Sequence, residues 1–455
     1  MTLSKKLAEY TVNLKYEDLP SEVVEFTKLC ILDWYGSALA GKDEKPILAI
    51  KELAEEWGGN EQATLVTGGK SSIGNACLVN GASSHIVELD DIHKSSIIHA
   101  GTVVIPAAVA VAEAYNLSGK DLITAVVAGY EVCYRVGEAV SPSHYYYWHN
   151  TATCGTFGSA AAAAKLLNLN VEQTAYALGN AGTQAAGLWE FIEDGANTKQ
   201  LHTAKAAYNG TLAAMLARSN FTSASKILEG RRGFFNAMSD EFDAGKITKN
   251  LGNEFKIMEN SFKIHASCRH THPAMDCVLE LMKEHSLHHE QLQNVTIKTY
   301  QTVLNITDNP KPDTIYASKF SSQFCAALIA VNGSASLKDY NNDALSSNVI
   351  REVMEKIDVQ SDPYYENAYP EKWGARVEMT LKDGRTLVSS TDYPKGDPEK
   401  MASSEELVEK FRTMTIGKVN NAKEHIKAVL TLEEMNVRNW MQLLGESSVS
   451  EKQPQ

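Results

Sequence analysis

The stretch Thr156-Phe-Gly-Ser-Ala-Ala-Ala-Ala-Ala-Lys165 consists almost entirely of small residues. Three other runs of the same character occur at Ser71–His85, Leu178–Gly187 and Ala204–Ala217. Small side chains allow helix axes to approach closely. Apolar residues at helical spacing predict further helices at 5–14, 21–40 and 45–57. The first part of the chain, to about residue 250, is therefore expected to be a tightly packed bundle of helices.

The pattern changes after about residue 255. Residues alternate with period two at 294–300, 375–381 and 385–391, and Lys382-Asp-Gly between the last two favours a hairpin turn. Helical patterns occur at 273–285, 320–331 and 343–357, and again at 404–413 and 421–444. We therefore predict a mainly α fold. A large all-helical domain comprises 1–258 and 398–455, and a smaller α+β lid domain, 259–397, is inserted before the C-terminal helices.

Bulk composition limits the possible functions. The 455 residues carry 43 basic and 56 acidic side chains, a formal charge of −13, and no basic run suggests a nucleic-acid partner. The longest apolar stretch begins at Val103 and stops at Glu113, short of a membrane span. Seven scattered cysteines without a CxxC pair, and no signal peptide, predict a cytoplasmic protein with reduced thiols. An anionic substrate would need cations gathered at its site.

The segment His85-Ile-Val-Glu-Leu-Asp-Asp-Ile-His-Lys-Ser-Ser-Ile-Ile-His99 packs three acids and three histidines into fifteen residues. We interpret it as a helix end followed by a loop that its leucine and isoleucines bury at least in part. Buried carboxylates and imidazoles need partners and often have function. A solvated, acid-capped loop and a metal site are the alternatives.

Two further clusters lie near expected helix starts. His149 ends an aromatic run, and four small or polar residues separate it from a helix whose N-terminus would favour an anion. Lys199 follows Asn197 and Thr198, which we expect to cap the next helix. A lysine there opposes the helix dipole, and a bound carboxylate would offset this. The alternatives are a core histidine and an exposed lysine.

The segment His265-Ala-Ser-Cys-Arg-His-Thr-His272 superficially resembles a metal site. It lacks the paired ligand spacing of structural zinc. The chain also has no Walker loop, no convincing dinucleotide fingerprint and no GxSxG motif.

Taken in order along the chain, these clusters resemble the MmgE/PrpD family. The resemblance also includes Gly119–Glu131, Lys319–Phe324 and Tyr393–Pro398, and it spans nearly the whole chain. The family includes 2-methylcitrate dehydratase, cis-aconitate decarboxylase and iminodisuccinate epimerase. The resemblance implies a helical domain with a smaller lid, a cleft between them, and a homodimer. It also implies a small polycarboxylate substrate, no metal and no organic cofactor.

The resemblance assigns residues with mixed results. His99, His149, Lys199 and Lys263 match the family's two histidines and two lysines, although the loop before His99 is one residue longer. At four other positions the sequence departs from the lyases of the family: it has Glu88 in place of an aspartate, Ile92 in place of a threonine, Cys268 in place of a histidine and Phe324 in place of a tyrosine. Arg269 and His270 are typical of other branches of the family, epimerase-like ones included.

The chemistry that the resemblance implies is proton removal beside a carboxylate, which needs fixed positive charge around an enediolate. Lys199, Lys263, Arg269 and a protonated His99 could supply the charge. We expect His149 to be the base. Asp91 or Glu88 would orient an imidazole or act as a second acid or base, with Cys268 and His270 among the substrate-binding residues.

Four functions follow from these residues. The leading hypothesis is a lyase, dehydratase or decarboxylase, acting on a citrate- or aconitate-like acid. The second is an epimerase or isomerase of a dicarboxylate such as iminodisuccinate, which Cys268 and Phe324 favour. A catalytically silent helical dimer and a metalloenzyme using His265–His272 are the remaining alternatives.

Overall fold

A computed structural model describes residues 1–446 and contains two compact units. The first comprises Met1–Ile86, Asp90–Asn260 and the described residues from Ser403 onward, and the second comprises Val87–Leu89 and Ser261–Ala402. The short segment Val87–Leu89 thus belongs to the second unit although the residues on both sides of it belong to the first.

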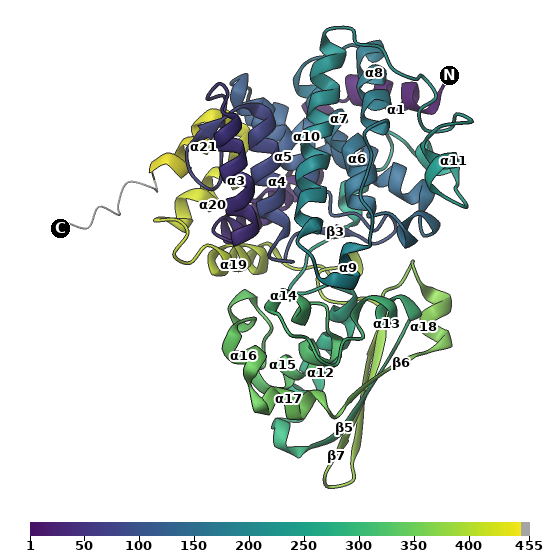
Figure 1. Cartoon of the computed structure of the whole chain (residues 1–455), viewed down its shortest axis with the longest axis vertical. Helices are drawn as coiled ribbons and strands as arrows, with labels where there is room; N and C mark the ends of the chain where they lie inside the picture. Colours follow the sequence, from purple (N-terminus) through teal and green to yellow (C-terminus); the bar gives the residue numbers. More distant parts are fainter. Residues whose placement is uncertain (447–455) are drawn as a thin grey trace, which may run out of the picture. The chain divides into compact units, whose positions relative to one another are not determined.

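The first unit is built from helices, with only two-residue strands among its described residues (Figure 1). Helices α4, α5, α6, α7 and α10 pack against one another at its centre. Its helices are α1 (Leu3–Asn13), α2 (Ser21–Gly41), α3 (Lys45–Trp57), α4 (Ile73–His85), α5 (Gly101–Ala114), α6 (Gly119–Val140), α7 (Asn150–Leu166), α8 (Val171–Gly182), α9 (Phe191–Asp194), α10 (Thr198–Arg218), α11 (Phe234–Met238), α19 (Ser404–Met414), α20 (Ala422–Leu430) and α21 (Val437–Glu446). The short strands within it are β1 (Ala63–Thr64), β2 (Lys70–Ser71) and β3 (Ile92–His93). Strand β4 (Asn260–Ser261) begins at Asn260, where the segment Asp90–Asn260 of this unit ends.

The small-residue runs explain how closely these helices pack. Gly210 of α10 lies against α7, where a Cβ atom would be 2.4 Å from Cβ of Ser159 and 2.6 Å from the carbonyl oxygen of Thr156. No side chain larger than hydrogen fits at this crossing. Small residues around Ser159 are therefore required because α10 crosses α7 there.

The second unit contains a four-stranded sheet in the order β6-β5-β7-β8. Strand β5 (Leu292–Thr299) is parallel to β6 (Ile357–Ser361) and antiparallel to β7 (Ala375–Leu381), which forms a hairpin with β8 (Thr386–Thr391). Helix α12 packs on β7 and β8, and α15 packs on β6. The helices of this unit are α12 (His272–Glu284), α13 (Gln301–Thr307), α14 (Ile315–Ser318), α15 (Ser322–Asn332), α16 (Asn342–Ser346), α17 (Asn348–Met354) and α18 (Pro363–Ala368).

The predicted fold class, mainly α with a smaller α+β part, is confirmed. Two predicted helices were wrong in detail. The helix expected over 343–357 breaks at Ser347, whose extended backbone and side chain cap α17, and its last residue begins β6. The helix expected over 421–444 breaks between α20 and α21, because Met435 is extended and its carbonyl oxygen accepts a hydrogen bond from Gly119 N at 2.8 Å.

Candidate active site

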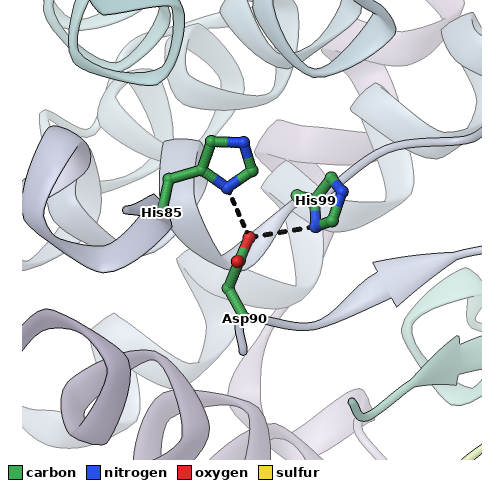
Figure 2. A group of neighbouring side chains, drawn as sticks. All are labelled: His85, Asp90 and His99. Carbon is green, nitrogen blue, oxygen red and sulfur yellow. Dashed lines mark hydrogen bonds and ion pairs between the residues drawn. The ribbon is translucent and has the colours of Figure 1, made fainter. Parts of the chain in front are cut away.

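The loop between α4 and α5 carries a carboxylate that holds two histidines (Figure 2). Asp90 Oδ2 lies 2.8 Å from Nδ1 of His85 and 2.9 Å from Nδ1 of His99, and all three side chains are buried. A carboxylate oxygen accepts the hydrogen bond from Nδ1 of His85. Nδ1 of His99 also lies 2.8 Å from the backbone oxygen of Asp91, so it has only acceptors beside it and carries the proton. The Nε2 atom of each ring is then the one that can take up or release a proton. The predicted helix end and buried loop are confirmed, since α4 ends at His85.

Asp91 points to different partners from its neighbour. Its Oδ1 accepts from the backbone N–H of Gly101 at 2.9 Å, and its Oδ2 accepts from Tyr130 Oη and Asn260 Nδ2, each at 2.7 Å. Only its backbone oxygen reaches a ring, 2.8 Å from His99 Nδ1. The side chain therefore ties the loop to α5 and α6, while the carboxylate that orients the imidazoles is that of Asp90. A role of Asp91 in proton transfer stays a prediction.

Burial makes Asp91 a source of pH-dependent stability. Desolvation raises the pKa of its carboxyl from 3.8 to about 7, against the opposing hydrogen bond from Tyr130. Between these values the unfolded chain releases a proton that the folded chain keeps, so the free energy of unfolding falls as pH rises. In Asp91→Asn this contribution is absent. Urea unfolding from about pH 4 to pH 7 should therefore show the stability gap between variant and wild type narrowing as pH rises, whereas parallel profiles would contradict the assignment.

His149 is the N-cap residue of α7, which begins directly at Asn150 and not four residues later as predicted. Its Nδ1 lies 3.2 Å from Nδ1 of His202, and its ring centroid is 4.9 Å from that of Trp189 and 5.8 Å from that of His85. Burial, followed by the nearby His202, His85, Lys199 and His99, holds the pKa of His149 well below its usual 6.5. His149 is consequently a neutral imidazole at physiological pH.

Lys199 lies in the first turn of α10, as predicted, but it is buried, with only 3% of its surface exposed. The expected side-chain cap was wrong: Asn197 occupies the N-cap position without a capping hydrogen bond from its side chain. The charge of Lys199 contributes to the lowered pKa values of His149 and His202, the latter to about 4, chiefly through burial. Lys205, further along α10, is exposed and lies 4.9 Å from the ring centre of Tyr208. The exposed-lysine alternative therefore fits Lys205 and not Lys199.

Glu88 and Lys263 form a buried ion pair within the second unit. Lys263 Nζ is 3.1 Å from Glu88 Oε2, and Tyr316 Oη donates to Glu88 Oε1 at 3.1 Å. Glu88 has a φ of 57°, in the left-handed region that costs a non-glycine residue about 1 kcal/mol or more. The surrounding contacts hold this strained residue in place. That Glu88 and Lys263 bind substrate stays a prediction.

The other predicted residues of the second unit have neighbouring protein groups as partners. The Arg269 guanidinium forms an ion pair with Asp397 and lies 3.0 Å from His272 Nδ1. His270 Nδ1 lies 2.7 Å from Tyr300 Oη, and its ring stacks on Trp373 with centroids 4.3 Å apart. Cys268 precedes the 3-10 turn Arg269–Thr271 and, like Phe324, is buried. That Cys268, Arg269 and His270 bind substrate stays a prediction.

Three groups of side chains among residues 1–446 have potential ligand atoms within 4.8 Å of one another. They are His85–Asp90–His99, His93–Glu138–Glu259 and the largely exposed His288–His289–Glu290. The first has the short distances of hydrogen bonds between carboxylate and imidazole. The predicted alternative at His265–His272 is not among the three, because His265 contacts Asp276 at 2.9 Å while His270 contacts Tyr300.

The contacts of His99 and His149 define a cluster in the first unit that also contains Asp90, His85, His202 and Trp189. These last four residues were not predicted as site residues. His202 carried a usable signal, since it lies three residues after Lys199 and thus on the same helix face. The first unit therefore buries the imidazole of His149, the imidazole of His99 beside Asp90, and the amino group of Lys199. This combination suits proton transfer at a carbon whose developing negative charge needs a cation nearby.

None of the helices described by the structure combines the length and the apolar character needed to cross a membrane.

Comparison with known proteins yields two family matches and several relatives. The N-terminal domain model of MmgE/PrpD matches residues 5–246, and the C-terminal domain model matches residues 265–434. The chain is 27% identical over 467 residues to the cis-aconitate decarboxylase-like protein oryM of Aspergillus oryzae, covering 95% of this chain and 94% of that protein. It is 26% identical to the cis-aconitate decarboxylase of Aspergillus terreus, with the same coverage. The mitochondrial 2-methylcitrate dehydratase of Yarrowia lipolytica is 24% identical over 309 residues, covering 64% of this chain and 58% of that protein. Since the two models together cover most of its length, the chain belongs to the MmgE/PrpD family.

Proposed function

We propose that this protein is a cofactor-independent lyase that acts next to a carboxylate on a citrate- or aconitate-like polycarboxylic acid. The relatives reported above are named as a cis-aconitate decarboxylase, a cis-aconitate decarboxylase-like protein and a 2-methylcitrate dehydratase. Decarboxylation and dehydration of such acids are both lyase reactions. The similarity extends over nearly the whole chain for the decarboxylases.

The observation that carries the proposal is that His149, in contact with His202, and Lys199 are both buried in the same helical unit. The charge of Lys199 contributes to the lowered pKa of His149. A base must be unprotonated at working pH, and burial with neighbouring positive charge keeps His149 so. The same lysine charge that lowers the pKa of the base would stabilise the negative charge that forms when the base takes a proton. One pair of side chains therefore meets both demands of carbanion chemistry beside a carboxylate.

For dehydration, the proposed reaction begins with heterolytic cleavage of the C–H bond beside the carboxylate. Nε2 of His149 takes the proton, and the electron pair delocalises into the carboxylate as an enediolate that Lys199 stabilises. For dehydration, this pair then expels the β-hydroxyl group, which leaves as water with a proton from His99. For decarboxylation no C–H bond is broken: the C–CO₂ bond breaks, CO₂ leaves, and the electron pair left on carbon takes a proton from Nε2 of His99. Asp90 would hold His99 in the orientation for either proton delivery.

An epimerase acting on a dicarboxylate is the second candidate. It is favoured by the two imidazoles of His99 and His149, which are held by separate partners, Asp90 and His202. Two bases held apart can remove a proton from one face of a carbon and return one to the other. Cys268 and Phe324, where lyases of the family have histidine and tyrosine, favour the same candidate through the resemblance.

A single experiment separates these candidates. Purified protein is incubated in D₂O with a panel of di- and tricarboxylates, and the products are followed by proton NMR. A new vinyl signal supports the lyase, and deuterium incorporation with inversion but without a new product supports the epimerase. A panel that covers both substrate classes and shows neither change would refute both.

Chelation tests the absence of a catalytic metal. We expect turnover to survive exhaustive dialysis against EDTA, because the carboxylate–imidazole contacts at Asp90 are those of an acid–base arrangement and no step above uses a Lewis acid. Metal analysis of the dialysed protein accompanies the assay. Activity that is lost on chelation and regained with a divalent ion would instead assign a metal to this protein.

The homodimer and the cytoplasmic location remain proposals. The seven cysteines are all free and buried in the structure, which fits a reducing compartment. Light scattering of the purified protein tests the dimer, and a mass of one chain at micromolar concentration would contradict it.

A further inference from the structure

We propose that His202 is a positioning residue that fixes the tautomer of His149 and thereby makes His149 a base. The inference rests on the proposed function in one respect only, namely that His149 takes the substrate proton. It assigns a role to a side chain to which neither the resemblance nor the predicted site gave one.

The rings of His149 and His202 are in contact through their Nδ1 atoms. Nδ1 of His149 and Nδ1 of His202 are 3.2 Å apart, a distance at which one nitrogen must donate and the other accept. A neutral imidazole carries one N–H, so exactly two arrangements exist. Either His149 donates from Nδ1 and keeps a lone pair on Nε2, or it accepts at Nδ1 and carries its proton on Nε2.

Only the first arrangement lets His149 act as a base through Nε2. A neutral histidine without a partner favours the Nε2–H tautomer, which would block that atom. His149 therefore needs an acceptor at Nδ1, and the Nδ1 atom of His202 lies at the required position. Because His202 then carries its own proton on Nε2, it adopts the tautomer that it favours in any case.

Both rings are held where this contact forms. His202 is one turn into α10, and the cap position of α7 places His149 opposite it. The backbone N–H of His149 donates to the carbonyl oxygen of Gly187 at 2.9 Å, which fixes the position of the His149 backbone. The rings of Trp189 and Phe191 lie 4.9 Å from His149 and 5.4 Å from His202, respectively, and cover the pair. His149 is 1% exposed and His202 8% exposed, so water competes little for the bond.

The charged groups around the pair favour neutral rings. His202, His85, Lys199 and His99 each disfavour a proton on His149, and His85 and Lys199 do the same for His202. Burial is the largest cause of the lowered pKa of both rings. Two neutral imidazoles that share one hydrogen bond are therefore the expected resting state at neutral pH.

The test compares two substitutions with wild type. His202→Asn retains an amide oxygen that can accept from Nδ1 of His149, and His202→Leu retains neither donor nor acceptor. We expect His202→Leu to lose about a hundredfold in kcat with KM changed by less than about threefold, since the base and not binding is affected. His202→Asn should have a kcat within about tenfold of wild type. Thermal melting of both variants confirms that they fold.

A second measurement reads the tautomer directly and needs no substrate. With ¹⁵N-labelled histidine, long-range ¹H–¹⁵N spectra should show His149 protonated at Nδ1 in wild type and His202→Asn, and at Nε2 in His202→Leu. His149→Gln assigns the signals. A wild-type His149 protonated at Nε2, a Leu variant with normal kcat, or Asn and Leu variants with equal losses would each overturn the proposal. If no substrate is found, the proposed function fails, but the spectra still decide the tautomer.

Discussion

Lys199→Ala should lower kcat/KM at least about a hundredfold, roughly 2.7 kcal/mol, the loss expected when one contact to developing charge is removed. Lys199 is buried in the first turn of α10, where the dipole and desolvation both oppose an ammonium group. Steady-state kinetics on the substrate identified by the D₂O experiment measures the change. The variant should melt within a few degrees of wild type, because removing the lysine also removes a costly buried charge.

Lys205→Ala is the matched control, since it removes the same group from the same helix. Lys205 is exposed and lies over the ring of Tyr208, so its loss should remove only a weak surface contact. We expect kcat/KM to change by less than about threefold, since a contact of this strength is worth about 1 kcal/mol or less. Equal effects of the two substitutions, or near-normal turnover of Lys199→Ala, would show that Lys199 does not stabilise the reacting charge.

Much of the fold was predictable because helical periodicity and period-two alternation are local properties. The runs of small residues indicated close helix packing, and Gly210 against Ser159 gives the physical reason for them. Of the two helices predicted too long, 343–357 breaks at a local cap formed by Ser347, and 421–444 breaks for a non-local reason. At Met435, a hydrogen bond to Gly119, more than three hundred positions earlier, replaces the next helical turn. A pattern read along one segment does not contain that partner.

The residues that could form the site were predictable from the sequence, but which of their side chains contact one another was not. The acid-rich loop, His149 and Lys199 were identified from the sequence, and the structure brings His99, His149 and Lys199 into one electrostatic neighbourhood. The choice between Asp90 and Asp91 was not available from the sequence, because adjacent residues of an irregular loop point where the backbone directs them. The left-handed φ values of Glu88 and Ile97, 57° and 55°, give this loop a path that no periodicity indicates.

Asp90→Asn should have the other large effect, a fall in kcat/KM of roughly a hundredfold to ten-thousandfold, the range for disabling a general acid or base. One oxygen of Asp90, Oδ2, lies within 2.9 Å of Nδ1 of both His85 and His99. An amide oxygen in its place could accept from both rings, but it carries no charge and accepts more weakly than a carboxylate. His99 would then lose the negative charge that stabilises its imidazolium form.

Asp91→Asn is the adjacent control, and the two variants should differ in kind. The side chain of Asp91 contacts Gly101, Tyr130 and Asn260, and none of these contacts reaches an imidazole. Its substitution should therefore appear mainly as a pH-dependent change in stability, measured by urea unfolding, with a smaller fall in kcat/KM than in Asp90→Asn. Asp90→Asn should change the pH profile of kcat, because it alters the acid that delivers the proton, while its unfolding midpoint changes less. If instead Asp91→Asn abolishes turnover and Asp90→Asn leaves it intact, then Asp91 is the acid–base carboxylate and the assignment of Asp90 is wrong.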